Sequence, residues 1–103
     1  MLGPSGLRLV LRASADADLE NIARYSFESW GEEQARDYLG ALLHHLQGLA
    51  AGTKRQREYV SRSGRSYLRS KFGAYFVFAL RTGDALHIVR ILHERRDMPR
   101  HLA

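Results

Sequence analysis

The feature that most constrains the fold is a pair of strand-forming runs on either side of one short turn, within residues 73–92. The first run, Tyr75 to Leu80, is aromatic and apolar on both alternating faces, which is typical of a strand covered on both sides. In the turn, Gly83 can adopt the positive φ of a short hairpin loop, and Asp84 can hydrogen-bond its own backbone. The pattern predicts a β-hairpin with a central first strand, which the rest of the chain must cover or extend.

A chain of 103 residues predicts one domain with a single small core. We expect residues 1–6 to form a flexible leader and residues 7–103 to form the domain. The longest uninterrupted apolar run, Ala74 to Leu80, is far shorter than the roughly 20 residues of a spanning helix, so no membrane association is predicted. The chain has no cysteine, which excludes disulfides and thiolate metal sites and is consistent with a cytoplasmic protein.

Two amphipathic helices are predicted before the hairpin. Ser14 or Asp16 can cap the first helix, which ends at Gly31. The second begins at Glu32 and places apolar residues on one face at helical spacing, a pattern that continues to Leu49. Because only Gly31 separates the helices, they must fold back as an antiparallel pair whose joint apolar stripe lies on a sheet. His44 and His45 have no further ligand at metal-binding spacing, so neither a metal site nor a cofactor is predicted.

The remaining strands are short. Leu7 to Arg12 and Ser66 to Phe72 are predicted to join the sheet, whereas Thr53 to Gly64 is predicted to be a polar connection and the least structured part of the domain. These elements predict an α+β fold in the order β-α-α-β-β-β, with a helical hairpin on one face of a mostly antiparallel four-stranded sheet and a short helical turn at Met98 to Leu102. The other sheet face is expected to be partly open. The predicted core consists of Leu19, Ile22, Trp30, Tyr38, Leu42, Leu46, Phe76, Phe78, Ile88 and Ile91.

Charge is divided unevenly along the chain. Residues 1–50 hold four arginines and seven acidic residues, a net charge of −3, whereas residues 51–103 hold 12 lysines and arginines and four acidic residues, a net charge of +8. A surface of the second kind attracts nucleic acid or an acidic protein segment, although solvated cations are the plain alternative. The residues predicted to bind a partner are Arg62, Arg65, Arg69, Lys71, Arg90, Arg95 and Arg96.

Several segments together resemble a known family. They are Asp18-Leu-Glu-Asn-Ile22, Trp30-Gly-Glu-Glu-Gln-Ala35 and the closing segment Val89-Arg-Ile-Leu-His-Glu-Arg-Arg-Asp97. In this order they resemble ParE-type toxins of the RelE/ParE superfamily, with the likeness running from about Leu7 to Leu102. The resemblance implies the toxin of a type II toxin–antitoxin pair, which a ParD-like antitoxin holds inactive and which poisons DNA gyrase. It also implies contact with DNA only through the antitoxin or gyrase, and either a homodimer or a toxin–antitoxin hetero-oligomer.

The other branch of this superfamily, the RelE-like toxins, cleaves messenger RNA on the ribosome. Such cleavage needs a group to take the 2′-hydroxyl proton, a proton donor and cations for the phosphate. His93 is the best candidate for the acid or base, with Arg69, Lys71 and Arg90 as cations. A histidine at a strand end that bonds to the backbone is the commoner case, so we favour a non-enzymatic docking protein with no catalytic residue. A ribosome-dependent endoribonuclease is the alternative.

Overall fold

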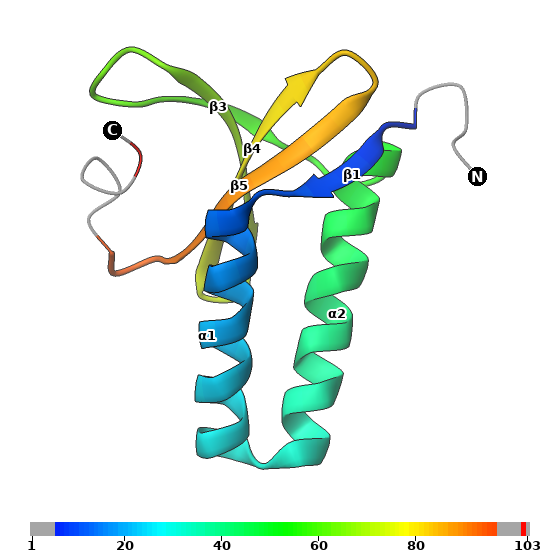
Figure 1. Cartoon of the computed structure of the whole chain (residues 1–103), viewed down its shortest axis with the longest axis vertical. Coiled ribbons are helices and arrows are strands. Elements are labelled where there is room, and N and C mark those ends of the chain that lie inside the picture. Colours follow the sequence, from blue (N-terminus) through cyan, green and yellow to red (C-terminus); the bar gives the residue numbers. More distant parts are fainter. Residues whose placement is uncertain (1–5, 97–101, 103) are drawn as a thin grey trace.

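The computed structural model describes residues 6–96 and residue 102. The elements, shown in Figure 1, are β1 (Arg8–Leu11), α1 (Ala13–Trp30), α2 (Glu32–Ala51), β2 (Arg57–Val60), β3 (Ser66–Phe72), β4 (Tyr75–Thr82) and β5 (Ala85–His93). The strands form one sheet in the order β1-β5-β4-β3-β2, in which β1 runs parallel to β5 and the other neighbours are antiparallel. The predicted α+β class and the helical hairpin on a mostly antiparallel sheet are confirmed. The first five residues of the leader predicted for residues 1–6, and most of the helical turn predicted for residues 98–102, lie outside the described residues.

The sheet has five strands, so the predicted number of four is wrong. The extra strand is β2, which pairs antiparallel with β3 and lies in the segment predicted to be a loop. Of its four residues only Tyr59 is partly buried, and the aromatic ring of Tyr59 lies 5.3 Å from that of Phe78. An edge strand with one inward side chain has too short an alternation to be recognised as a strand from the sequence.

The predicted hairpin is formed by β4 and β5, and β4 is the central strand of the sheet. Thr82 pairs with Ala85, so Gly83 and Asp84 make a two-residue turn, and Gly83 has the positive φ (59°) that this turn requires. A β-bulge between Phe78 and Ala79 shifts the register of the two strands.

The two helices begin and end close to the predicted positions. Gly31, with φ 87° and ψ 172°, ends α1 and leads directly into α2. The predicted side-chain cap of α1 is wrong, because Arg12 occupies the cap position without a side-chain hydrogen bond. Ser14 instead donates a 2.7 Å hydrogen bond to the Val89 carbonyl of β5. Over the described part of the chain, neither helix has the length and apolar character needed to cross a membrane.

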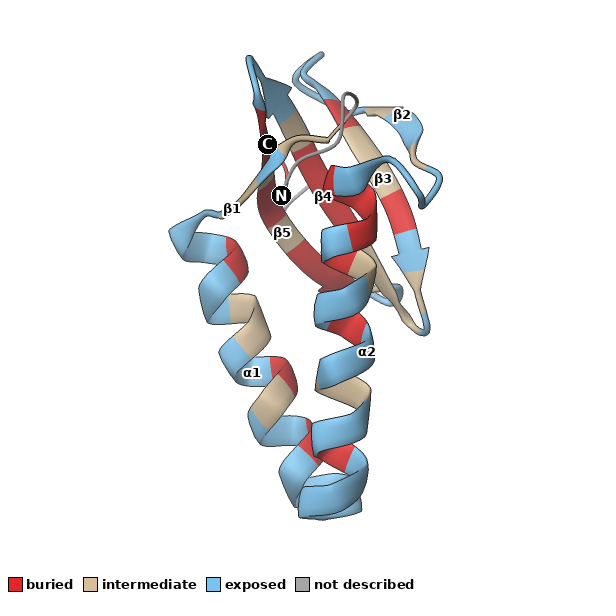
Figure 2. Cartoon of the chain, turned by 90° about the vertical axis from the view of Figure 1, so that its right-hand side faces the viewer, coloured by how far each residue is buried: buried red, intermediate tan, exposed pale blue. Residues whose placement is uncertain are grey.

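Apolar side chains are buried on both sides of the sheet. Buried residues recur along β4 and β5 in Figure 2. The side that faces the helices holds the larger cluster, and the other side holds a second cluster that includes Leu102. Of the predicted core residues, Ile22, Leu42, Leu46, Phe78, Ile88 and Ile91 are buried, and Leu19, Tyr38 and Phe76 are partly buried.

Trp30 is not a core residue, because 41% of its surface is exposed. The helical hairpin projects beyond the sheet, so the end of α1 has no strand to cover it (Figure 1). The indole ring lies between the rings of Tyr25 and Tyr38 instead, with centroid distances of 6.3 and 5.3 Å.

Candidate functional site

The side of the sheet that faces away from the helices carries both cations and aromatic rings. Strand pairing places Arg57 opposite Arg69 and Lys71 opposite Phe76, and Tyr59 follows on the same side of β2. We call the surface formed by Arg57, Tyr59, Arg69, Lys71 and Phe76 the basic sheet face. It is the candidate functional site because it combines positive charge with partly exposed aromatic rings.

Cation–π contacts hold the cations of the basic sheet face in place. The guanidinium carbon of Arg69 lies 4.7 Å from the ring centroid of Phe76 and 5.3 Å from that of Tyr59. Lys71 Nζ lies 5.6 Å from the Phe76 centroid and also pairs with a Glu94 oxygen at 2.9 Å. The hydrogen bond and charge of Lys71 lower the pKa of Glu94. Such contacts let long side chains cover the rings while their charged ends stay in water.

Arg57 and Arg69 are like charges directly opposite each other on neighbouring strands. Like-charged pairs in this position are destabilising. No ion pair between Arg57 or Arg69 and a carboxylate is found among the residues that the structure describes. An acidic group from a partner that lies between Arg57 and Arg69 would therefore reduce the repulsion between the two arginines and would itself be attracted to both.

A pocket of about 240 Å³ lies further along the same side of the sheet. The side chains that line it include Arg12, Arg65, Arg90, Tyr67, Leu80 and Leu102. Tyr67 donates a 3.2 Å hydrogen bond to the carbonyl oxygen of Leu102. The cations Arg12 and Arg65 beside apolar side chains suit an acidic group that adjoins an apolar one.

Arg90 is held by Asp18 of α1. The Asp18 carboxylate accepts hydrogen bonds from Arg90 Nε at 2.8 Å and from Arg90 Nη2 at 3.0 Å, and this pairing raises the pKa of Arg90. The same carboxylate accepts a 2.8 Å hydrogen bond from the backbone nitrogen of Ile91. Because β1 ends at Leu11, Asp18 and Ser14 bind the edge of β5 where that edge has no neighbouring strand. Arg90 thus joins α1 to the sheet.

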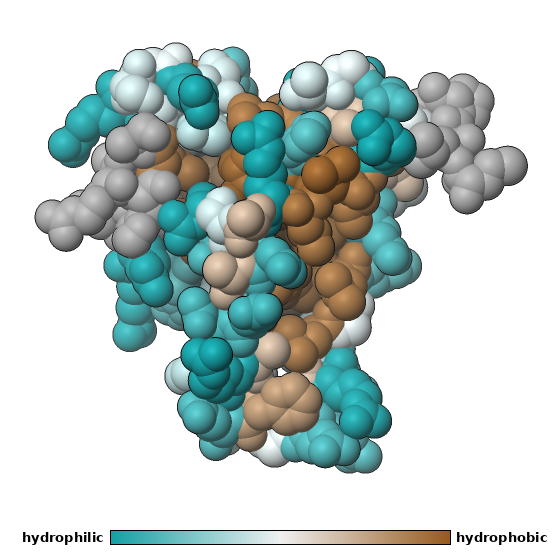
Figure 3. Space-filling model, viewed as in Figure 1, coloured by the Kyte–Doolittle hydropathy of each residue, from teal (hydrophilic) through white to brown (hydrophobic). Residues whose placement is uncertain are grey.

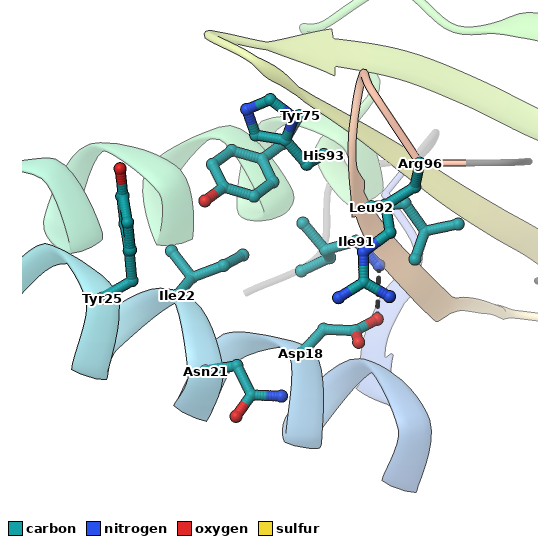
Figure 4. Close-up of a pocket in the computed structure, with 9 residues that line it drawn as sticks. All are labelled: Asp18, Asn21, Ile22, Tyr25, Tyr75, Ile91, Leu92, His93 and Arg96. Atoms are coloured by element: carbon teal, nitrogen blue, oxygen red, sulfur yellow. Dashed lines mark hydrogen bonds between the residues drawn. The ribbon is translucent and has the colours of Figure 1, made fainter.

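The other predicted cations do not share one surface. Arg62 and Arg65 are exposed in the loop between β2 and β3. Arg95 and Arg96 are exposed just after β5, and Arg96 lines a recess on the helix side of the sheet. Figure 4 shows this recess, where the Arg96 side chain extends toward Asp18.

The residues considered for catalysis are divided between the two sides of the sheet. His93 pairs with Tyr75 on the helix side, whereas Arg69 and Lys71 lie on the other side. His93 Nδ1 accepts a 3.2 Å hydrogen bond from the backbone nitrogen of Arg95, and its ring lies 5.4 Å from that of Tyr75. The histidine and these two cations therefore project from opposite faces of the sheet, and the third predicted cation, Arg90, is bound by Asp18. In the described residues, no three His, Cys, Asp or Glu side chains are grouped as metal ligands would be.

Four residues of these sites were not predicted from the sequence: Arg12, Asp18, Arg57 and Tyr59. Arg57 and Tyr59 alternate with Glu58 and Val60 in the sequence. If β2 had been recognised as a strand, this alternation would have predicted that Arg57 and Tyr59 lie on the same face. The role of Asp18 has no local signal, because its partner Arg90 is 72 positions away in the sequence.

Comparison with known proteins places the chain among bacterial toxins. The sequence profile described as the ParE toxin of the type II toxin–antitoxin system parDE matches residues 9–98. Toxin ParE from Escherichia coli is 36% identical over 95 residues, which cover 91% of each chain. Toxin ParE1 from Mycobacterium tuberculosis H37Rv is 34% identical over 97 residues, which cover 92% of this chain and 97% of the relative. A solved structure described as a chromosomal ParDE system from P. aeruginosa has the same fold, with a TM-score of 0.70, 18% identity and coverage of 84% of this chain and 95% of the other.

Proposed function

Because this chain belongs to the ParE toxin family of type II toxin–antitoxin systems, we propose that it arrests growth in the cytoplasm by poisoning DNA gyrase. We further propose that a ParD-like antitoxin neutralises it in a toxin–antitoxin hetero-oligomer. It would then meet DNA only through gyrase or the antitoxin.

The observation that carries the antitoxin proposal is the basic sheet face. Arg57 and Arg69 repel each other, Arg69 lies over two aromatic rings, and the pocket beside them adds further arginines. An acidic, amphipathic segment of the antitoxin can place carboxylates between the two arginines and apolar side chains against the rings. Because Arg57 is exposed and Arg69 is only partly buried, salt should screen their attraction to an acidic segment, so binding should weaken as salt concentration rises.

Apolar groups on the helix side can extend this contact. Figure 3 shows hydrophobic residues gathered between the two helices, and the exposed side chains of Phe27 and Leu43 belong to the hairpin. A long antitoxin segment can reach both sides of the toxin, as disordered segments that fold on binding often do.

The separation of His93 from Arg69 and Lys71 supports a toxin that works by docking instead of bond cleavage. One observation favours the alternative, a RelE-like endoribonuclease. The pocket lined by Arg12, Arg65 and Arg90 could take a phosphate, and Arg12 Nε donates a 3.4 Å hydrogen bond to Nδ1 of His87.

Two assays with the purified protein separate these functions. Docking on gyrase predicts that gyrase stalls on cleaved DNA, while mRNA in a translation extract stays intact. Cut mRNA together with normal supercoiling would refute the gyrase proposal and favour the endoribonuclease.

The antitoxin surface has its own test. The double substitution Arg57→Ala and Arg69→Ala should weaken binding to the antitoxin by about 10- to 100-fold, the range for losing two charged interface contacts. Arg24→Ala is the matched control, because Arg24 is exposed on α1 and, within the described part of the chain, its side chain donates a hydrogen bond only to Asn21 of the same helix. Equal affinity of both variants and the parent protein, measured by calorimetry, would exclude the basic sheet face as the antitoxin site.

A further inference from the structure

A recess lined by aromatic rings lies on the helix side of the sheet, near the free end of the helical hairpin. Its lining residues are Tyr25, Trp30, Tyr38, Ala74, Tyr75 and His93, and its volume is about 400 Å³. We call it the aromatic hollow. It continues into the recess of Figure 4, with which it shares Tyr25, Tyr75 and His93.

The rings of the aromatic hollow face in different directions. The planes of Tyr25 and Trp30 meet at 77°, those of Trp30 and Tyr38 at 69°, and those of Tyr75 and His93 at 87°. Nearly perpendicular rings present π-faces on more than one side of the space between them. Tyr25 is 59% exposed and Trp30 is 41% exposed, so a ligand can reach both rings.

The hollow also offers hydrogen-bond acceptors. Burial raises the pKa of Tyr38 and of Tyr75, and the neighbouring tyrosines raise both further, so the phenols are neutral at pH 7. The contacts of the described residues include no hydrogen bond to the hydroxyl of Tyr25, Tyr38 or Tyr75. A ligand N–H group would therefore find phenol oxygens free to accept it.

Charges of both signs lie near the hollow, although none of its lining side chains is acidic. Glu28 is outside the lining, three residues after Tyr25 on the same side of α1. Glu28 is exposed, and no described residue pairs with it. Arg96 lines the adjoining recess, where its side chain extends toward Asp18 (Figure 4).

We propose that the aromatic hollow binds an arginine side chain presented by a protein partner. A guanidinium is attracted to the π-faces of tryptophan and tyrosine, stacks on them as a planar group and can donate several hydrogen bonds to the phenol oxygens. The carboxylate of Glu28 adds an attraction that an uncharged side chain lacks. The toxin thus has two docking surfaces with opposite preferences: the basic sheet face for acidic groups and the aromatic hollow for a basic one. This inference depends neither on the target nor on the antitoxin.

The test uses Trp30, the one tryptophan in the chain, as a fluorescent reporter inside the hollow. The folded protein is titrated separately with N-acetyl-arginine amide, with its neutral isostere N-acetyl-citrulline amide and with N-acetyl-leucine amide. We expect a saturable change with the arginine compound and at least about fivefold weaker binding of the two neutral compounds, as loss of a cation–π contact implies. Tyr25→Leu and Glu28→Gln should each weaken arginine binding by about two- to fivefold.

Val60→Ala is the control, since Val60 is an exposed apolar residue on β2 outside the lining of the hollow, and this variant should bind like the parent. Circular dichroism checks that each variant is folded. The proposal fails if the neutral compounds bind as well as the arginine compound, if Tyr25→Leu leaves arginine binding unchanged, or if no saturable signal develops up to roughly 100 mM, a weaker affinity than such contacts support.

Discussion

The ion pair between Asp18 and Arg90 is the contact whose loss should most clearly weaken the fold. In Asp18→Asn, one amide oxygen replaces two carboxylate oxygens that accept hydrogen bonds from Arg90 Nε, Arg90 Nη2 and the Ile91 nitrogen. The Asp18 and Arg90 side chains are only 12% and 23% exposed, so water replaces these bonds poorly. Breaking a buried pair costs about 3–5 kcal/mol, and because Arg90 retains some access to water we expect about 3 kcal/mol.

Urea unfolding of the purified variant measures this loss directly. Thermal unfolding should show a decrease in Tm of roughly 12–24 °C, since 1 kcal/mol shifts the Tm of a domain of this size by about 4–8 °C. Asp16→Asn is the control in the same first turns of α1, because Asp16 is exposed and its side chain has no hydrogen bond or ion pair to another described residue. Its attraction to the helix dipole contributes about 0.3–1 kcal/mol.

A second variant tests the cause of the loss. Asp18→Leu combined with Arg90→Met should be more stable than Asp18→Leu alone, because the double variant leaves no unpaired charge near the core. If Asp18→Asn and Asp16→Asn lose the same stability, Asp18 does not join α1 to β5 as argued.

Three further predictions concern other parts of the fold. Burial, with a smaller effect of Lys54, lowers the pKa of His45 below 6.5, so the unfolded chain binds the extra proton as pH falls through about 6.5. The free energy of unfolding from urea titrations should then decrease as pH falls from about 7.5 to about 5.5. This decrease should be smaller in His45→Gln and unchanged in His44→Gln. Equal pH profiles of the two variants would contradict the prediction. Gly31→Ala should lower the free energy of unfolding by roughly 1–3 kcal/mol, because Gly31 has a positive φ. Gly40→Ala should raise it by up to about 1 kcal/mol, because Gly40 lies inside α2 with open space around the new Cβ. Calorimetry that shows both variants stabilised, or both destabilised, would contradict this prediction. Phe78→Ala should cost roughly 3–5 kcal/mol in urea unfolding, because Phe78 is fully buried on the second side of the sheet, and a loss below about 1 kcal/mol would mean that this cluster is not well packed.

Local patterns in the sequence predicted the helical hairpin and the β4–β5 hairpin. The spacing of apolar residues through Leu42 and Leu46 places them on one face of a helix. Gly83 adopts the positive φ of a turn that most other residues disfavour. Both signals lie within a few residues of the structure that they specify, so they could be recognised without knowledge of distant contacts.

The site was less predictable. Arg69 and Lys71 were chosen for their charge, yet their aromatic supports come from β2 and β4, and β2 has too few inward residues to be recognised. The charge of Arg90 was evident in the sequence, but its partner Asp18 is supplied by a helix at the other end of the chain.

By itself, the sequence determined the two hairpins, the order of the elements and the excess of positive charge in the second half, because periodicity, turn residues and charge are local properties. Only the tertiary structure decided which cations share a surface and that Trp30 lies in an open hollow. Those outcomes depend on strand register and on how far the helices extend past the sheet, which are set by contacts between residues far apart in the chain.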